Sequence, residues 1–200
     1  MAIVAITNFK GGVGKTTTAI AVAILLSKEG KVLLIDSDQN KSAIQWASYD
    51  NLPFDVRLEA EARPLLMSGK YQHVVIDSQA APDAGEVAAL CKGSDLLIVP
   101  TSPEPLALKS TGRVAAEATG NGHMMALVTM TPPNPQRDGV DARDALVRAG
   151  VPCFERLIRK SKVYVQASES GADMSAGTGR MPTYWRDWVE VGKELGTILQ

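Results

Sequence analysis

Two lysines and three glycines stand close together near the start of the chain, in the segment Lys10-Gly-Gly-Val-Gly-Lys15-Thr-Thr. Glycines let successive backbone N–H groups turn toward one anion, and a helix that begins after them adds partial positive charge. In such a loop Lys15 would contact the terminal phosphates of a nucleotide, and the Thr16 hydroxyl would bind Mg²⁺. The predicted nucleotide-binding residues are Lys10, Gly11, Gly12, Val13, Gly14, Lys15, Thr16 and Thr17.

The flanking residues supply the context that such a loop needs. An apolar run, Ala2 to Ile6, precedes it, and a second apolar run, Ala19 to Leu26, follows it. Strand, loop and helix in that order are typical of a phosphate-binding loop, whereas a glycine-rich turn that merely joins two elements is the alternative. The usual pattern has glycine where this chain has Phe9, and the loop instead carries an additional lysine, Lys10.

The loop resembles the deviant Walker A motif of the ParA/MinD family of dimerising ATPases, and most closely the small plasmid-partition ParA branch without an N-terminal helix-turn-helix. In that family the additional lysine, Lys10 here, crosses to the nucleotide of the partner subunit. The resemblance implies a homodimer that forms on ATP binding, with Lys10 and Lys15 both catalytic. It also implies a ParB-like centromere-binding protein or cargo adaptor that stimulates hydrolysis.

Three aspartates follow apolar runs that are expected to be strands. Asp77 ends the run 73–77, as a Walker B aspartate does, and would orient Mg²⁺ through a water. Asp36 and Asp38 correspond to the Asp-x-Asp-Pro-Gln segment of the resembling family, although the proline is absent before Gln39. There the first aspartate supports the metal shell and the second orients the attacking water. The expected metal residues are Thr16, Asp36 and Asp77, and Asp38 is the third expected catalytic residue.

Apolar runs alternate with helical segments along the whole chain, at the spacing of right-handed βαβ crossovers. We therefore expect one α/β domain over residues 1–200, with a mostly parallel sheet and helices on both faces. The expected strands are 2–6, 31–36, 54–58, 73–78, 95–100, 124–130 and 154–158. The expected helices lie within 15–29, 42–49, 63–67, 84–91, 106–119, 139–149, 163–170 and 183–199.

A late basic cluster is the candidate DNA-binding segment. Arg156, Arg159, Lys160 and Lys162 lie within seven residues. In a dimer they would supply about eight positive side chains, enough for salt-sensitive contacts with phosphates. No base-reading motif accompanies them, so sequence-specific readout is not indicated, and the resemblance implies nonspecific DNA as the partner. A solvated charged loop is the alternative interpretation.

Composition limits the other possibilities. The formal net charge of −1 excludes a strongly basic field over the whole surface, so DNA binding would need a local patch. Cys91 and Cys153 lack metal-ligand spacing and are expected to be reduced thiols in a cytoplasmic protein. No apolar run reaches the ~18 residues that span a bilayer. The N-terminus enters a strand at once, without the charged region of a signal peptide. The resemblance implies association with the nucleoid in the ATP state.

Two other functions remain open at this point. Relatives of MinD type end in a membrane anchor, and the last expected helix carries an apolar stripe. Its polar positions, Asp187, Glu190, Lys193 and Glu194, are net acidic, which favours packing against the domain over a lipid surface. The second alternative function is that of an enzyme such as dethiobiotin synthetase, which couples ATP to small-molecule chemistry on the same scaffold. The loop of Pro133, Asn134 and Pro135 is a candidate for contact with adenine.

Overall fold

The computed structural model describes residues 1–79, 82–118, 123–133 and 137–200. Its centre is a six-stranded sheet with the order β3-β2-β4-β1-β5-β6, and every pair of neighbouring strands is parallel. The strands are β1 (Ala2–Ile6), β2 (Val32–Asp36), β3 (Asp55–Leu58), β4 (His73–Asp77), β5 (Leu96–Thr101) and β6 (His123–Val128). The expected fold class is confirmed.

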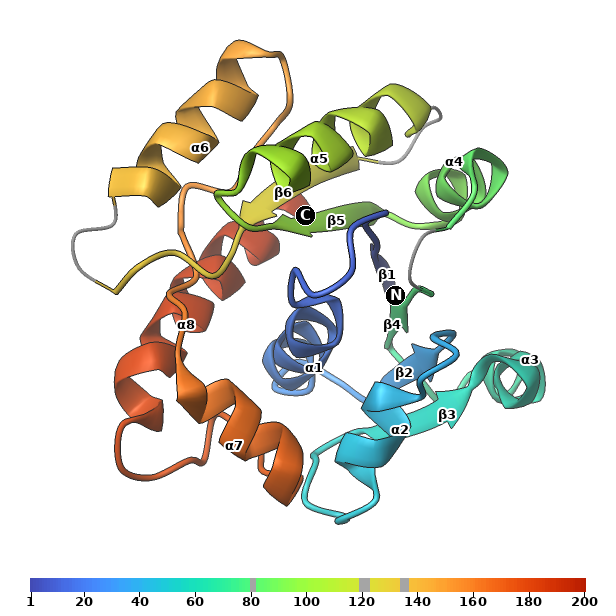
Figure 1. Cartoon of the computed structure of the whole chain (residues 1–200). Helices are drawn as coiled ribbons and strands as arrows, with labels where there is room; N and C mark the ends of the chain where they lie inside the picture. Colours follow the sequence, from blue (N-terminus) through green and yellow to red (C-terminus); the bar gives the residue numbers. More distant parts are fainter. Residues whose placement is uncertain (80–81, 119–122, 134–136) are drawn as a thin grey trace.

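Helices cover both faces of this sheet (Figure 1). They are α1 (Lys15–Leu26), α2 (Ser42–Ala47), α3 (Glu59–Met67), α4 (Ala84–Gly93), α5 (Pro105–Glu117), α6 (Arg137–Arg148), α7 (Lys162–Ser170) and α8 (Met181–Ile198). The core clusters place α1, α2, α7 and α8 against one face, and α3, α4, α5 and α6 against the other. Burial on both faces explains why the inner strands are mostly apolar, and all five residues of β2 are buried, whereas the edge strand β3 is less buried and carries Asp55 and Arg57.

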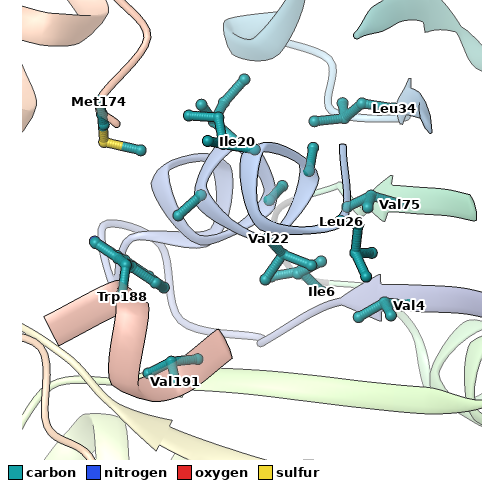
Figure 2. Close-up of a cluster of buried hydrophobic side chains, with 14 of the residues drawn as sticks. Val4, Ile6, Ile20, Val22, Leu26, Leu34, Val75, Met174, Trp188 and Val191 are labelled. Atoms are coloured by element: carbon teal, nitrogen blue, oxygen red, sulfur yellow. The ribbon is translucent and has the colours of Figure 1, made fainter. Parts of the chain in front are cut away.

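The largest core cluster surrounds α1, which is wholly apolar from Ala19 to Leu26 and lies between the sheet and α8 (Figure 2). Val22 of α1 lies beside Ile6 of β1, whereas Ile20 projects from the opposite side of the helix, toward Met174 and Leu34. The apolar stripe of α8 therefore belongs to the core, as its charge pattern favoured. No helix in the described ranges is long and apolar enough to cross a bilayer.

The strand register brings the predicted site together at one edge. Asp36 pairs with Asp77 across β2 and β4, and Asp77 also pairs with Ile6, from which the glycine-rich loop leaves β1. In parallel sheets the carboxyl ends of the strands form the usual ligand-binding edge. The topology therefore places both aspartates beside the loop.

The expected strand at 154–158 is wrong. Bends at Glu155 and Arg156 interrupt this segment, which forms isolated bridges with the β6 region on either side of the bends, Ala126 to Cys153 and Thr131 to Arg159. Between them the N–H groups of Glu155 and Arg156 donate to the carboxylate of Glu194, at 2.7 and 2.9 Å. These bonds to α8 replace the ladder that a sixth neighbouring pair would need.

Candidate nucleotide site

The glycine-rich loop has the backbone geometry of an open anion cradle. Gly12 and Gly14 have φ angles of 75° and 88°, which favour glycine. A Cβ atom on Gly11 or Gly12 would meet nothing within 4 Å, so the space above the loop is free. Gly14 precedes α1, and no described side chain caps the start of this helix. Its first N–H groups are therefore available to a phosphate.

Asn8 anchors the start of the loop, and the sequence analysis missed it. Its side chain is fully buried; Nδ2 donates to the carbonyl of Pro100 at 2.9 Å, and Oδ1 accepts from Ser110 at 2.6 Å. Oδ1 also accepts from the backbone N–H of Lys10 at 3.0 Å. Asn8 thus ties the loop to β5 and α5. A polar residue two positions after a buried strand was the only signal.

Thr129 fixes the loop from the other side. Its buried hydroxyl lies 2.9 Å from the carbonyl of Val13 and 3.2 Å from that of Thr101. The end of β6 is thereby attached to the loop just before α1 begins. No local sequence pattern marks this threonine, because its partners Val13 and Thr101 are distant along the chain.

Lys15 is poised to bind an anion. Only 7% of its surface is exposed, and burial lowers the pKa of its ammonium group, while the nearby carboxylates of Asp77 and Asp38 oppose that shift. A buried ammonium group is costly unless it has a partner, and a phosphate at the loop would supply the negative charge. The structure therefore places Lys15 near the carboxylates of Asp38 and Asp77.

Asp77 is a buried carboxylate that needs a ligand. Neither of its oxygens makes a hydrogen bond of ordinary geometry within the described part of the chain. Burial raises its pKa to about 7, against the opposing effects of the Thr16 hydroxyl and the Lys15 ammonium group, while Asp36 and Asp38 raise it further. No group of three or more His, Cys, Asp or Glu residues with metal-binding geometry occurs among the described residues. This donor set fits Mg²⁺, which keeps several waters and takes few protein ligands beside the phosphates.

Asp36 and Asp38 have different surroundings. Asp36 is 2% exposed, and its two oxygens accept the backbone N–H groups of Asp38 and Ile44, each at 3.0 Å. It therefore shapes the turn and holds the start of α2. Asp38 is less buried, and its Oδ1 accepts from the backbone of Asn40 at 2.8 Å. The Asp38 carboxylate can therefore reach solvent, as a residue that orients water must.

Lys10 lies apart from this cluster. Its side chain is exposed and forms no ion pair with any residue that the structure describes. The neighbouring Phe9 stacks under the guanidinium of Arg113, 4.5 Å from the ring centre. One lysine of the loop is therefore buried at the site and the other is exposed to solvent.

A small cavity adjoins the loop on the α7 side. Its volume is about 170 Å³, and its lining includes Gly14, Thr17, Met130, Ile158 and Tyr164. The cavity adjoins the first turn of α1, the place at which the phosphates of a nucleotide would bind. The sequence analysis instead named the loop of Pro133, Asn134 and Pro135 for adenine; Asn134 and Pro135 lie outside the described residues.

The predicted DNA-binding cluster separates into two pairs. Arg156 and Arg159 both form ion pairs with Asp187, which is fully buried in α8. Lys160 and Lys162 are exposed and have no such partner in the described ranges. Asp187 was counted among the polar positions of α8, but its carboxylate is buried. Helical spacing alone cannot identify a buried carboxylate that pairs with two arginines. Only the two lysines remain free for phosphate contacts.

The sheet, the glycine-rich loop and the aspartates at the strand ends define a phosphate-loop nucleotide-binding protein of the α/β class. The family profile of the CobQ/CobB/MinD/ParA nucleotide binding domain matches residues 4–174, and the chain belongs to this family. The resemblance inferred from the loop is thereby confirmed, and the chain is an ATPase of ParA/MinD type.

Individual relatives agree with this assignment. The chain is 35% identical over 186 residues to "Maintenance of carboxysome distribution protein A" of Gloeobacter kilaueensis, covering 89% of this chain and 86% of that protein. It is 22% identical over 190 residues to "Protein ParA" of Rhizobium radiobacter, covering 87% and 85%. An ATP complex of a Cyanothece McdA variant superposes with a TM-score of 0.77 at 20% identity, covering 98% of this chain and 96% of that one. The MinC:MinD complex of Aquifex aeolicus gives a TM-score of 0.75 at 16% identity, with the same coverage.

Proposed function

We propose that the protein is an Mg²⁺-dependent ATPase that dimerises on ATP and binds DNA without sequence preference. Through this cycle it would drive the partition or positioning of a plasmid or another cargo. The observation that carries the proposal is the loop with two lysines in different environments, Lys15 buried at the site and Lys10 exposed beside it. The names of relatives, which include "Protein ParA" and two carboxysome-distribution proteins, support a role in positioning a cargo.

The chain's own residues account for most of the chemistry. Backbone N–H groups of the loop and the Lys15 ammonium group hold the phosphates, while Thr16 and Asp77 would hold Mg²⁺. When bound, Mg²⁺ would neutralise charge on the phosphate oxygens. Asp36 keeps the following turn in place, and Asp38 orients the attacking water. Phosphoryl transfer needs mainly such placement and charge neutralisation.

Lys10 would complete the site of the opposite subunit. An exposed cation at the rim of a phosphate loop can contact a phosphate across an interface, in the manner of an arginine finger. Hydrolysis would then depend on dimer formation, and the dimer would bring two copies of Lys160 and Lys162 onto one DNA duplex. A ParB-like protein or cargo adaptor would stimulate hydrolysis and release the dimer from DNA.

A membrane-associated positioning ATPase is the second candidate, because a putative MinD of Chlorella vulgaris is 24% identical over 213 residues. The buried stripe of α8 does not favour it, since Trp188, Val191 and Leu195 are each no more than 2% exposed. These residues could contact lipid only if α8 left the core.

One binding experiment separates the candidates. The pure protein is titrated onto a random-sequence DNA duplex and onto anionic vesicles, with ATP, ADP or no nucleotide. We expect DNA binding that requires ATP and weakens steeply as salt is raised. Lys15→Ala is the control that should lose ATP binding and therefore DNA binding. ATP-dependent binding to vesicles without binding to DNA would overturn the proposal in favour of the membrane candidate.

A further inference from the structure

One wall of the cavity beside the phosphate loop consists of residues 158–161, which begin at the last residue of the expected strand 154–158. Ile158, Arg159, Lys160 and Ser161 line this cavity opposite Gly14 and Thr17. Because the wall is neither helix nor strand, its own backbone pattern does not hold it in place. Its position depends on bonds to its two neighbours, the β6 end and α8.

On the β6 side, backbone bonds attach the wall to the segment that follows the strand. The N–H groups of Ile158 and Lys160 donate to the carbonyls of Val128 and Thr131, at 2.9 and 2.8 Å. These bonds determine the register of the wall. They leave its opposite side, which faces α8, to be held by side chains.

On the α8 side, one buried carboxylate makes those contacts. Asp187 Oδ2 accepts from Arg159 Nε at 2.7 Å and from the Arg159 backbone N–H at 3.3 Å. Asp187 Oδ1 accepts from Arg159 Nη2 at 3.0 Å and from both Nε and Nη2 of Arg156. The aspartate is fully buried, so each of these bonds lies away from competing water.

Two further groups of α8 fix the same arginine. Arg159 Nη2 donates to the carbonyl of Thr183 at 2.6 Å, and its guanidinium lies 5.0 Å from the ring centre of Tyr184. Tyr184 in turn packs edge to face on Tyr164, another residue that lines the cavity. Arg159 is therefore held along its length, from the backbone at the cavity to the guanidinium at α8.

We propose that Asp187 is a positioning residue of the nucleotide site, which holds the 158–161 wall where it receives the nucleoside part of ATP. The proposal rests on the proposed function, in which the phosphates of ATP bind at the loop of Gly11 to Thr17. Asp187 does not touch the nucleotide; it acts through Arg159. Arg156 shares the carboxylate but does not line the cavity, and it serves as an internal comparison.

The test uses two ligands that differ in whether they carry a nucleoside. A fluorescent ADP analogue needs both the phosphate loop and the cavity, whereas inorganic tripolyphosphate needs only the loop. Asp187→Asn and Arg159→Met should each weaken ADP binding by about tenfold, a change of ~1.4 kcal/mol, and leave tripolyphosphate affinity within about twofold. Arg156→Met should lower the melting temperature with little effect on ADP affinity. Glu190→Gln, which alters an exposed ion pair on the same helix, is the matched control.

The outcomes are distinct. If folded Asp187→Asn loses affinity for both ligands by the same factor, or for neither, Asp187 only stabilises the fold and the proposal is overturned. If Asp187→Asn does not fold, Arg159→Met decides by the same comparison, since it leaves the carboxylate paired with Arg156. If the wild-type protein binds tripolyphosphate but not ADP, the proposed function fails, whatever the variants do.

Discussion

At the scale of single residues, the two aspartates after β2 have separate tasks despite their spacing. Asp36 uses both oxygens for backbone N–H groups, while Asp38 keeps most of its carboxylate available at the edge of the site. A carboxylate that shapes a turn and one that orients water respond differently to mutation. Asp38 is therefore the residue at which chemistry can be separated from folding.

Asp38→Ala should keep ATP binding and ATP-dependent dimers but lower the turnover number by about 10²-fold or more, because a group that positions the nucleophile is lost. Steady-state phosphate release and size-exclusion chromatography with ATP measure the two effects. Gln39→Ala, which changes the exposed neighbouring side chain, should behave like wild type. Unchanged turnover in Asp38→Ala would show that another residue orients the attacking water.

Asn8→Ala tests the anchor of the phosphate loop. It would leave the Ser110 hydroxyl and the Lys10 N–H without their acceptor, so we expect a loss of roughly 1–3 kcal/mol in unfolding free energy. ATP affinity should fall as well, since the loop loses its attachment to α5. Ser27→Ala removes one hydrogen bond far from the site and should cost less. Urea denaturation and nucleotide titration provide both readouts, and an equal effect of the two variants would contradict the anchor role.

At the scale of elements, what could be predicted from sequence depended on whether the signal is local. Strand ends with aspartates and a glycine-rich loop before a helix are local patterns, and they identified the sheet and the phosphate site. The partners of Asn8 and Thr129 lie about a hundred positions away along the chain. The bond of Glu194 to the 155–156 backbone, which interrupts the expected strand, is likewise nonlocal. No periodicity encodes such contacts.

The basic segment that leads into α7 yields a revised prediction for DNA binding. Lys160→Ala/Lys162→Ala should weaken binding and lower the slope of log affinity against log salt by about two for each protomer on DNA. Its melting temperature should stay near that of wild type, since both lysines are exposed. Arg159→Ala should instead lower the melting temperature, because the buried Asp187 loses a partner. Full DNA affinity in the lysine double variant would exclude this segment as the interface.

The junction of α7 with α2 is a second element-scale test, because α7 contributes Tyr164 to the cavity and α2 follows the Asp38 turn. Gly171 ends α7 with a φ of 65°, and a Cβ there would lie 2.4 Å from the Cβ of Tyr49. Gly150 has a φ of 80° but open space around it. Gly150→Ala should cost roughly 1–2 kcal/mol from backbone strain alone. Gly171→Ala should cost ~1–3 kcal/mol more from overpacking, measured by chemical denaturation.

At the scale of the whole molecule, the proposed dimer requires that the catalytic site of one subunit be incomplete on its own. The monomer gathers Lys15, Asp38 and Asp77 around the loop, but it leaves Lys10 exposed and unpaired among the described residues. A cation that contributed to its own site would be expected to approach these carboxylates. The proposed dimer gives Lys10 a phosphate to contact, and this makes a prediction that depends on two chains at once.

Mixing two inactive variants tests whether Lys10 acts across the dimer. Lys10→Ala and Asp38→Ala should each hydrolyse ATP poorly when alone. In a mixed dimer, the Lys10→Ala subunit keeps its own Asp38 and receives Lys10 from its partner, so one site is complete. Equal mixing should restore roughly a quarter of wild-type turnover, since about half of the dimers are mixed and each has one complete site of two. Phosphate release measured against the mixing ratio should rise to a maximum at equal amounts. If Lys10 acted within its own subunit, no mixture would contain a complete site, and turnover would stay at the level of the separate variants.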